Sequence, residues 1–522
     1  MEGNGKLTFD TDMIEVKPQV ESGIKPITPD ELKKIMRDSF KVKSKNKVLH
    51  LELLDHEILN LRPITLLDDK TRMILVYLPT RTSSIIGKGD DAEELIEFQN
   101  RAYMVCSGQE KKVMPIEDSY LQKNFRIRIL QFWNENRWDK KRIFEWRDSQ
   151  EKVNPKMAFE LMLSTVKNYL DFESETDYVY FSLWNFHTYF YELFDSTPYN
   201  NYKGTKRAGK SKAMEFQKNV CFNPIMSADM TPATLFRTIE GIGATILLDE
   251  AENFKNKKDE KAQANRTLVM QGFLKDQYAV RNEGKTDGGF TPVQFNLYSP
   301  KSLASINNFD NVLEDRCIDH NMRRSKNKEL LNKWMDKRKD SRFTEIRDCC
   351  YRLFLDHGRE IDELQDEAGK LLSISGRELL MWKPIITLAL FFEKNGVSGI
   401  TGKIISKSSD SSESRQIQDE EESFDLRILQ FVSDHGLKID EKNNPEGWKP
   451  TKSLHTQLIL NKEDYGVIEE YMTIHKFAEI LKRLGFKRQK KESGISWLIN
   501  EEIIKDTKER MGIVDKKQDT LD

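Results

Sequence analysis

Cysteine and histidine are scarce in this chain of 522 residues, which has five cysteines and eight histidines. No two cysteines have C-x-x-C spacing, Cys349 and Cys350 are adjacent, and the histidines are scattered. This pattern argues against a zinc module and against a framework of disulfides. We therefore expect reduced thiols and an intracellular protein.

Long apolar runs and a strong net charge are also missing. The N-terminus lacks the basic start and apolar core of a secretory signal, and no apolar run approaches the length of a membrane span. We expect a cytoplasmic protein without a membrane partner. The formal net charge is −2, so any contact with nucleic acid must come from local basic patches.

One stretch, residues 204–211, has the pattern G-x-x-x-x-G-K-S of a phosphate-binding loop. Its two glycines let backbone N–H groups approach the phosphates of ATP. The Lys210 ammonium would reach the β- and γ-phosphates, and the Ser211 hydroxyl would bind Mg²⁺. A helix that begins near Gly209 would direct its positive end toward the anion. The residues assigned to nucleotide binding are Gly204, Thr205, Lys206, Arg207, Ala208, Gly209, Lys210 and Ser211.

A second motif follows, where the short apolar run 244–248 ends in Asp249 and Glu250. Such a run predicts a buried strand with carboxylates at its carboxyl end, which is where open α/β sheets bind ligands. We assign Asp249 to Mg²⁺ and Glu250 to the polarisation of an attacking water, with Glu252 as the next candidate.

The length predicts two to four domains. The expected fold is an α/β P-loop NTPase core, preceded by an α+β domain and followed by a winged-helix-like domain. The predicted boundaries are 1–117 for the N-terminal α+β domain with a loose tail, 118–196 for a helical bridge packed on the ATPase, 197–325 for the P-loop ATPase core, 326–400 for a helical lid, 401–423 for a flexible linker and 424–522 for the winged-helix-like domain.

Within the core, helices and strands alternate as in a parallel nucleotide-binding sheet. The strand expected over 197–202, which leads into the phosphate loop, is unusually polar. Residues 282–289 predict a hairpin or a pore-facing loop, and 291–298 predict another strand with Ser299 at its tip. His187 is interpreted as a core histidine rather than a ligand.

The C-terminal residues 424–499 have the order helix, basic hairpin and strand, which is typical of a winged helix. The densest basic patch of the chain lies here and consists of Lys482, Arg483, Lys487, Arg488, Lys490 and Lys491. It favours DNA contact, with a solvated charged hairpin as the alternative. The aromatic residues of 118–172 favour a helical core stripe, with a nucleic-acid stacking surface as the alternative.

The region 178–396 resembles a family of AAA+-like ATPases of plasmids, phages and archaeal elements, which often accompany primases and are viewed as helicase-like. The resemblance depends on the phosphate loop, the segments SADMTPATLFRTIE, LLDEAE, YSPKSLASI, LEDR…MRR and GRELLMWKPIITLA, and a lead-in of Trp184, Thr188, Tyr189, Phe194 and Pro198. It covers about two fifths of the chain and implies an AAA+-like parallel sheet with a helical lid.

The resemblance also implies roles for further residues. Ser299 matches a polar sensor position near the γ-phosphate, with Asn296 as a rival. Arg316 matches an arginine that reaches the nucleotide of a neighbouring subunit, and Arg377 matches a second sensor arginine on the lid. The alternatives are that Arg316 pairs with a neighbouring acid and that Arg377 is a surface residue.

Together these features predict an ATP- and Mg²⁺-dependent motor that acts as a DNA helicase or translocase in the replication of a plasmid, virus or related element. Its expected partners are further copies of the chain in a hexameric ring, single- or double-stranded DNA, and a primase or other replication protein. The alternative is a DNA-binding initiator or regulator that uses ATP as a switch and does not unwind. A small-molecule kinase is a third, weaker hypothesis.

Overall fold

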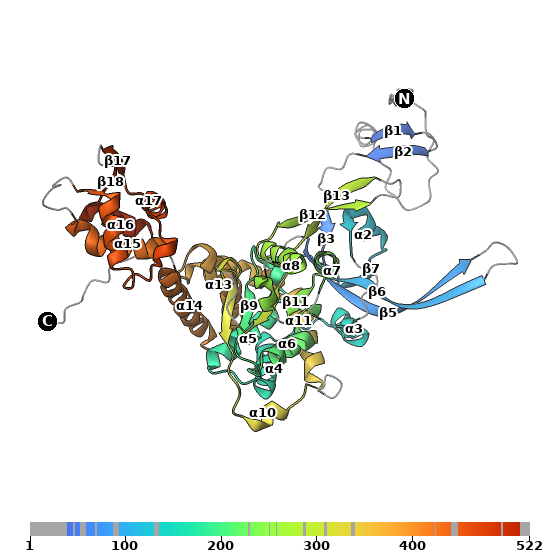
Figure 1. The fold of residues 1–522 in the computed structure, drawn as a ribbon. Coiled ribbons are helices and arrows are strands. Elements are labelled where there is room, and N and C mark those ends of the chain that lie inside the picture. Colours follow the sequence, from blue (N-terminus) through green and yellow to red (C-terminus); the bar gives the residue numbers. More distant parts are fainter. Residues whose placement is uncertain are drawn as a thin grey trace.

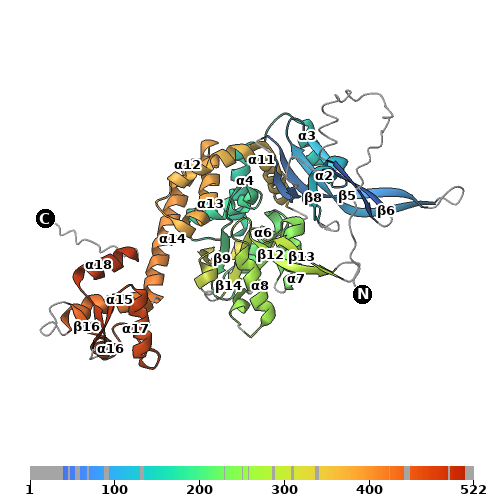
Figure 2. The same ribbon diagram turned by 90° about the horizontal axis from the view of Figure 1, so that it is seen from above.

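A computed structural model shows a central body with a long β-hairpin projecting on one side and a separate C-terminal unit on the other (Figure 1, Figure 2). The structure describes residues 39–44, 47–52, 59–67, 70–86, 93–129, 135–227, 230–249, 251–256, 258–284, 289–306, 311–335, 340–422, 424–439, 447–491 and 494–511. The short helix expected near Pro29 lies outside these residues. Within them, no helix is both long and apolar enough to cross a membrane.

The centre of the body is a parallel sheet of five strands in the order β10-β11-β14-β9-β15. The strands are β9 (Tyr199–Lys203), β10 (Pro224–Ser227), β11 (Thr245–Leu248), β14 (Lys301–Ser305) and β15 (Cys317–Asn321). The connecting helices are α6 (Lys210–Val220), α7 (Pro232–Ile242) and α8 (Glu260–Gln271), with the short α9 (Asn311–Glu314) before β15. This parallel sheet with surrounding helices is consistent with the P-loop NTPase-like core that the sequence predicts.

The polar strand β9 is central although it carries two asparagines. Asn200 and Asn201 are fully buried. Asn201 donates to Asp319 Oδ1 at 2.9 Å and accepts from the Ser305 hydroxyl at 3.2 Å. Asn200 accepts from the Tyr180 hydroxyl at 2.9 Å. Because buried amides are stable only when hydrogen-bonded, these contacts explain why aliphatic residues are not required here.

The hairpin of β12 (Tyr278–Gly284) and β13 (Phe290–Asn296) stands apart from the central sheet. Its strands are antiparallel, with Tyr278 opposite Asn296 and Gly284 opposite Phe290. This confirms a hairpin around 282–289, and residues 285–288 at its tip lie outside the described part of the chain. The alternative expectation of a pore-facing loop stays a prediction.

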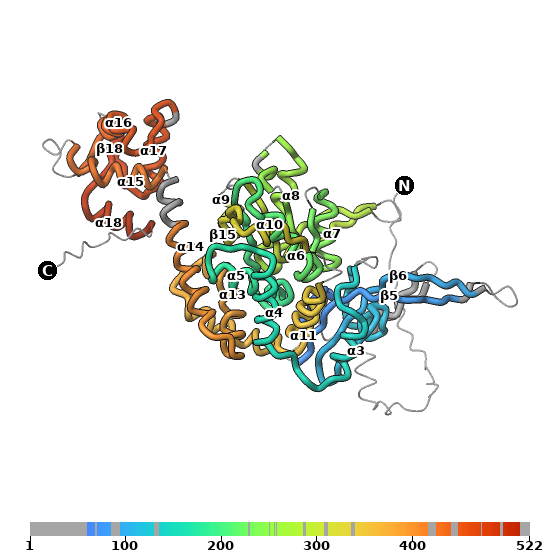
Figure 3. Tube along the Cα trace, turned by 90° about the horizontal axis from the view of Figure 1, so that it is seen from below, coloured from blue at the N-terminus to red at the C-terminus, as the bar shows by residue number. Residues whose placement is uncertain are grey.

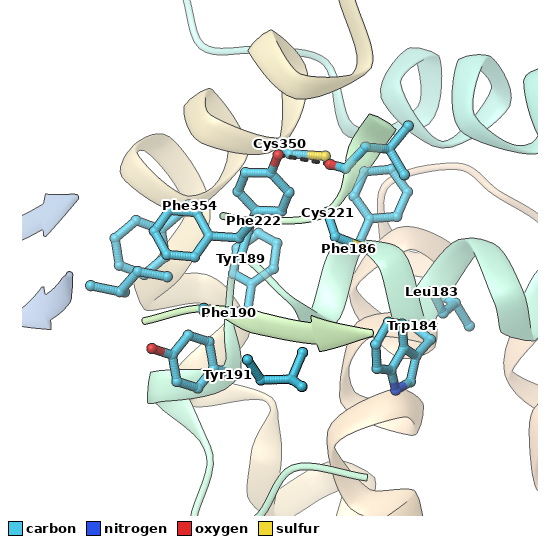
Figure 4. Packing of buried hydrophobic residues seen from close by; sticks show 14 of the residues in the cluster. Leu183, Trp184, Phe186, Tyr189, Phe190, Tyr191, Cys221, Phe222, Cys350 and Phe354 are labelled. Carbon is cyan, nitrogen blue, oxygen red and sulfur yellow. Dashed lines mark hydrogen bonds between the residues drawn. The ribbon is translucent and has the colours of Figure 1, made fainter. Parts of the chain in front are cut away.

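Several helices pack against the parallel sheet, and a large aromatic cluster is buried between them (Figure 4). These helices are α4 (Pro155–Tyr169), α5 (Glu175–His187), α11 (Arg342–Glu363), α12 (Gln365–Lys370) and α13 (Gly376–Lys394). Every residue of α5 from Val179 to His187 is buried. His187 accordingly lies in the core, where its Nε2 is 2.9 Å from the Thr197 hydroxyl.

The N-terminal strands from residue 59 onward belong to this same body, whereas the two before them form a two-stranded sheet of their own. In chain order, the N-terminal strands are β1 (Ser39–Ser44), β2 (Lys47–Glu52), β3 (Leu59–Leu61), β4 (Ile64–Leu66), β5 (Arg72–Ile86), β6 (Glu93–Ser107), β7 (Lys112–Pro115) and β8 (Phe125–Ile127). Arg72 Nε and the Ser107 hydroxyl both donate to the Leu355 carbonyl of α11, at 3.0 and 2.8 Å. Apolar residues from Leu61 to Ile404 form one continuous core, which strands β3 to β8 share with the parallel sheet.

The region expected as a helical bridge is more varied. It contains α2 (Ser119–Asn124), strand β8 and α3 (Lys140–Asp148) before α4 begins. Two of its aromatic residues, Trp138 and Trp146, are buried, and their indole N–H groups donate to Asp348 and Asp356 of α11 at 2.8 and 2.9 Å. These two tryptophans are therefore core residues rather than stacking surfaces.

The structure corrects the expectation of an unstructured linker over 401–423. Helix α14 (Ile400–Glu422) spans this segment, and residues Ile400 and Ile404 join the main core. Its side chains are mostly polar, so the sequence alone shows little apolar periodicity. Contacts with α5 and α13 stabilise the helix instead, including the ion pair of Lys407 with Asp177 at 2.7 Å.

The C-terminal unit begins with α15 (Phe424–His435) and has a core of its own (Figure 3). It continues with β16 (Trp448–Pro450), α16 (Thr451–Leu460), α17 (Ile474–Arg483), β17 (Arg488–Lys491), β18 (Gly494–Leu498) and α18 (Glu501–Arg510). The three strands form an antiparallel sheet in the order β16-β18-β17. In chain order, helix α17 is followed directly by the hairpin of β17 and β18.

Candidate nucleotide-binding site

The phosphate loop joins the end of β9 to the start of α6, at the carboxyl end of the parallel sheet. Gly204 approaches the backbone after β15 so closely that a Cβ there would lie 2.4 Å from the Met322 carbonyl oxygen. Gly209 has a φ of 94°, which favours glycine, and it caps the N-terminus of α6. Both glycines of the motif are thus required by the backbone, and α6 begins where an anion-binding helix should begin.

The Lys210 side chain folds back over this loop. Its ammonium donates to the carbonyl of Gly204 and, at 3.2 Å, to that of Thr205. Thr205, Lys206 and Arg207 are exposed around it. An ammonium held against the loop backbone lies where the phosphates of a bound nucleotide would be enclosed.

The two sequence motifs meet in space. The Ser211 hydroxyl donates to Asp249 Oδ2 at 2.9 Å. Asp249 directly follows β11, and Ser211 lies in the first turn of α6. Hydroxyl and carboxylate oxygens are ligands that Mg²⁺ accepts beside phosphate oxygens. Within the described residues, no group of three or more His, Cys, Asp or Glu could hold a metal ion by itself.

Glu250 lies outside the described residues, so its assignment stays a prediction. Its alternative, Glu252, is in the short 3-10 helix Ala251–Lys255. In the described part of the chain, the Oε2 atom of Glu252 is buried and has no hydrogen-bond partner. Glu252 lies three residues after Asp249, in the segment that follows the carboxyl end of β11.

The assignment of Ser299 as a sensor was wrong. Strand 291–298 was expected to enter the sheet, but β13 pairs with β12, and the sheet strand is β14, which follows Ser299. Because β14 runs parallel to β9, Ser299 lies at the amino end of the sheet and the phosphate loop at the carboxyl end. The Ser299 hydroxyl is buried against Lys301 Nζ at 3.2 Å. Asn296, the rival, lies further back along the chain and bonds to the Tyr298 N–H at 2.7 Å.

Sequence reasoning missed the residue that does reach the carboxyl end on this strand. Ser305 ends β14 opposite Lys203, the last residue of β9. Its hydroxyl donates to Asn201 Oδ1 at 3.2 Å. The run 302–305 of small and apolar residues could have indicated a second short strand, but the longer run 291–298 was the stronger local signal.

Lys203 was also missed, although it directly precedes the loop. Its ammonium is 3.0 Å from Glu314 and 2.9 Å from Asp319; the side chains of Lys203 and Glu314 are largely buried, and that of Asp319 is half-buried. Burial alone would lower the pKa of Lys203, but the two carboxylates outweigh it and hold the pKa above its usual range. This ion-pair group fixes the end of β9 against β15 and thereby supports the phosphate loop.

Arg316 and Arg377 lie together at the amino end of the sheet, away from the phosphate loop of their own chain. Arg316 precedes β15, and its Nε donates to the Met270 carbonyl at 3.2 Å. Arg377, in the first turn of α13, forms an ion pair with Asp315. Strand β15 has five residues, so it separates this pair from its own loop by roughly 16 Å at about 3.3 Å per residue. Burial and the nearby charge of Arg377 lower the pKa of Arg316.

The predicted basic patch lies on the C-terminal unit. The side chains of Lys482, Lys487, Arg488 and Lys490 are exposed along the end of α17 and the hairpin. Arg483 is less available because its guanidinium pairs with Asp425 of α15. The side chain of Lys491 lies outside the described part of the structure.

No protein-family profile matches this chain, and no curated protein matches it. Among solved structures, the chain is similar to SCCmec type IV Cch, an active helicase, with 10% identity, coverage of 86% of this chain and 100% of that one, and a TM-score of 0.36. For the NrS-1 C-terminal region the identity is 13%, the coverage 76% and 93%, and the TM-score 0.30. For Cdc6p of Pyrobaculum aerophilum the identity is 9%, the coverage 70% of this chain and 96% of that one, and the TM-score 0.16. Similarities this distant do not assign the chain to a family.

Proposed function

We propose that this chain is an ATPase that hydrolyses ATP with Mg²⁺ and uses the energy to move along DNA as a helicase or translocase. The observation that carries the proposal is the 2.9 Å contact between the Ser211 hydroxyl and Asp249. It joins the phosphate loop to the acidic strand tip at the carboxyl end of a parallel sheet, which is where such folds bind ligands. This geometry supports a site for ATP and Mg²⁺, which the motor and the ATP-switched initiator both require.

In this proposal each residue has a defined task. The N–H groups of the loop and the Lys210 ammonium hold the phosphates of ATP. Ser211 and Asp249 would hold Mg²⁺, which neutralises phosphate charge when bound. Glu250 would orient the attacking water.

Arg316 is proposed to act on the nucleotide of a neighbouring copy. It lies at the opposite end of the sheet from its own phosphate loop, so it cannot reach its own nucleotide without a large rearrangement. An arginine that contributes in trans requires a closed assembly in which each copy contacts the next, and a ring of six meets this need. Arg377, next to it, would face the same interface.

The C-terminal unit is proposed to be the DNA-binding, winged-helix-like part of the motor. Its order of helix, strand, two helices and hairpin is that of a winged helix, and its exposed basic residues lie along the end of α17 and the hairpin. The hairpin of β12 and β13 would contact nucleic acid inside the ring. In its most specific form, the proposal places this motor in the replication of a replicon, beside a primase.

The test is to measure ATP hydrolysis with and without single-stranded DNA, together with strand separation on a forked duplex. DNA-stimulated hydrolysis with unwinding is the expected result, and Lys210→Ala should abolish both. Nucleotide-driven assembly on DNA without unwinding would replace the motor by an ATP-switched initiator. Absence of ATP binding would contradict both functions.

A further inference from the structure

The C-terminal unit is joined to the ATPase body through α14. The two parts have separate cores, one of residues from Leu61 to Ile404 and one from Ile428 to Ile504. Helix α14 has 23 residues, which is a length of about 34 Å at 1.5 Å per residue. Only residue 423 separates it from α15 of the C-terminal unit. A shift of α14 would therefore move the C-terminal unit.

Helix α14 is not packed tightly along the sheet. A polar cavity of about 750 Å³ lies between it and the edge strand β15, lined by residues of both elements, including Asp319, Asn321, Ser411 and Arg415. Two ion pairs hold the helix beside this cavity. Lys407 pairs with Asp177 of α5 at 2.7 Å, and Arg415 pairs with Glu378 of α13 at 2.7 Å.

The ion pair of Arg415 with Glu378 lies next to the start of β15. Besides Glu378, the Arg415 guanidinium donates to the carbonyl of Cys317, the first residue of β15. Arg415 thus ties α14 to β15 directly after Arg316. Glu378, its other partner, directly follows Arg377, which pairs with Asp315. Arg415 therefore contacts the residue that follows Arg316 and the residue that follows Arg377.

We infer that Arg415 is a positioning residue that couples the Arg316–Arg377 interface to the C-terminal unit through α14. The inference rests on the proposed function, in which these arginines face the nucleotide of a neighbouring copy. When that nucleotide attracts the Arg316 guanidinium, the first residues of β15 and the start of α13 move with it. The planar guanidinium of Arg415, which holds both elements at once, transfers this displacement to α14. The cavity leaves room for the helix to move against β15.

Thermodynamic linkage gives the test, because coupled sites change each other's affinity by the same factor. DNA affinity is measured by fluorescence anisotropy, on labelled single-stranded and duplex DNA, with and without a non-hydrolysable ATP analogue. For the wild type we expect the analogue to change the dissociation constant of the preferred DNA by roughly 10-fold, within the usual range of allosteric coupling. Arg415→Ala should reduce this factor to about 2-fold or less, while ATP affinity, and DNA affinity without nucleotide, stay near wild type.

Lys407→Ala is the matched control. Lys407 lies on the same helix and forms an ion pair of equal length, with side chains about as exposed as those of Arg415 and Glu378. Its ion pair is with α5, and it does not join β15 to the start of α13 as Arg415 does, so the nucleotide-dependent factor should survive. Arg415→Lys keeps the charge but loses the planar guanidinium, and it should retain part of the nucleotide-dependent change in DNA affinity. If Arg415→Ala does not fold, as judged by circular dichroism, Glu378→Gln removes the same ion pair and replaces it in the comparison.

Three outcomes overturn the inference. The factor could persist in Arg415→Ala, it could disappear equally in Lys407→Ala, or the wild type could bind ATP and DNA without any coupling between them. In each of these cases the proposed function still stands, because ATP and DNA binding are measured separately. A wild-type protein that fails to bind ATP would overturn the proposed function and the inference together.

Discussion

Ser211 and Asp249 are 38 residues apart in the sequence, yet their side chains are joined by a 2.9 Å hydrogen bond. The contact brings a hydroxyl from the start of α6 and a carboxylate from the end of β11 to one point beside the phosphate loop. Neither residue is needed there for packing, since Ser211 is exposed and Asp249 is half-buried. In the proposed function, this convergence would place both oxygens beside Mg²⁺ and the phosphates of ATP.

Removal of the Lys210 ammonium should weaken ATP binding. Charge-assisted hydrogen bonds contribute roughly 1.5–3 kcal/mol each, so Lys210→Ala should raise the dissociation constant by about 10- to 150-fold. Titration calorimetry with ATP and Mg²⁺ measures this directly. Lys206→Ala is the control, because it removes an exposed side chain of the same loop but keeps the backbone N–H group that the loop offers to phosphate, and its effect should be much smaller. Equal affinities for wild type and Lys210→Ala would contradict the assignment of the loop.

Glu250→Gln should separate binding from chemistry. The amide cannot polarise the attacking water, so hydrolysis should slow by about 100-fold or more while ATP binding persists. Steady-state phosphate release, with calorimetry in parallel, distinguishes the two effects. Glu252→Gln is the matched variant. If it loses turnover and Glu250→Gln does not, Glu252 is the residue that orients water.

The basic patch of the C-terminal unit should contribute to DNA affinity and to its salt dependence. Each lost phosphate contact reduces the slope of log K against log salt by about 0.9 on duplex DNA. Lys487→Ala combined with Lys490→Ala should therefore lower the slope by up to about 1.8. Lys505→Ala with Lys508→Ala, which removes two charges from α18, is the control. Unchanged affinity and slope in the first pair would identify the hairpin as a solvated surface.

Arg316→Ala should bind ATP normally and fail to hydrolyse it if the arginine acts in trans. An arginine finger contributes about 1,000-fold or more to turnover. Mixing Arg316→Ala with Glu250→Gln should restore activity, because some interfaces then pair an intact Glu250 with an intact Arg316. Light scattering must show that the two variants assemble together. A monomer with full ATPase activity would end the proposal of a trans-acting arginine.

Acid should destabilise the fold partly through His187. Burial lowers the pKa of His187 to about 3, whereas the unfolded chain takes up this proton near pH 6.5. The stabilisation is therefore complete above about pH 6.5 and is lost as the pH falls toward 3, by at most about 1.4 kcal/mol per pH unit. Between pH 7 and pH 5 the thermal midpoint should fall less in His187→Gln than in wild type. His475→Gln, at an exposed position of α17, should behave as wild type; equal falls in all three proteins would contradict the prediction.

Much of the candidate nucleotide site could be predicted from the sequence because it depends on short contiguous segments. The phosphate loop needs glycines, a lysine and a serine at fixed spacing, and the structure folds them between β9 and α6 as expected. The acidic strand tip at Asp249 is equally local. Helix α7 also begins as expected, with Thr231 as its cap and Pro232 in its first turn.

Which strands enter the sheet was decided by the tertiary structure. The runs 291–298 and 301–305 are both short and both suit a strand, but only long-range pairing with β9 and β11 selects the second. That choice moved Ser299 to the wrong end of the sheet for a sensor. The same holds for α14, whose polar sequence predicts no helix by itself. It forms because Ile400 and Ile404 enter the core and because Asp177 and Glu378, from distant segments, pair with its lysine and arginine.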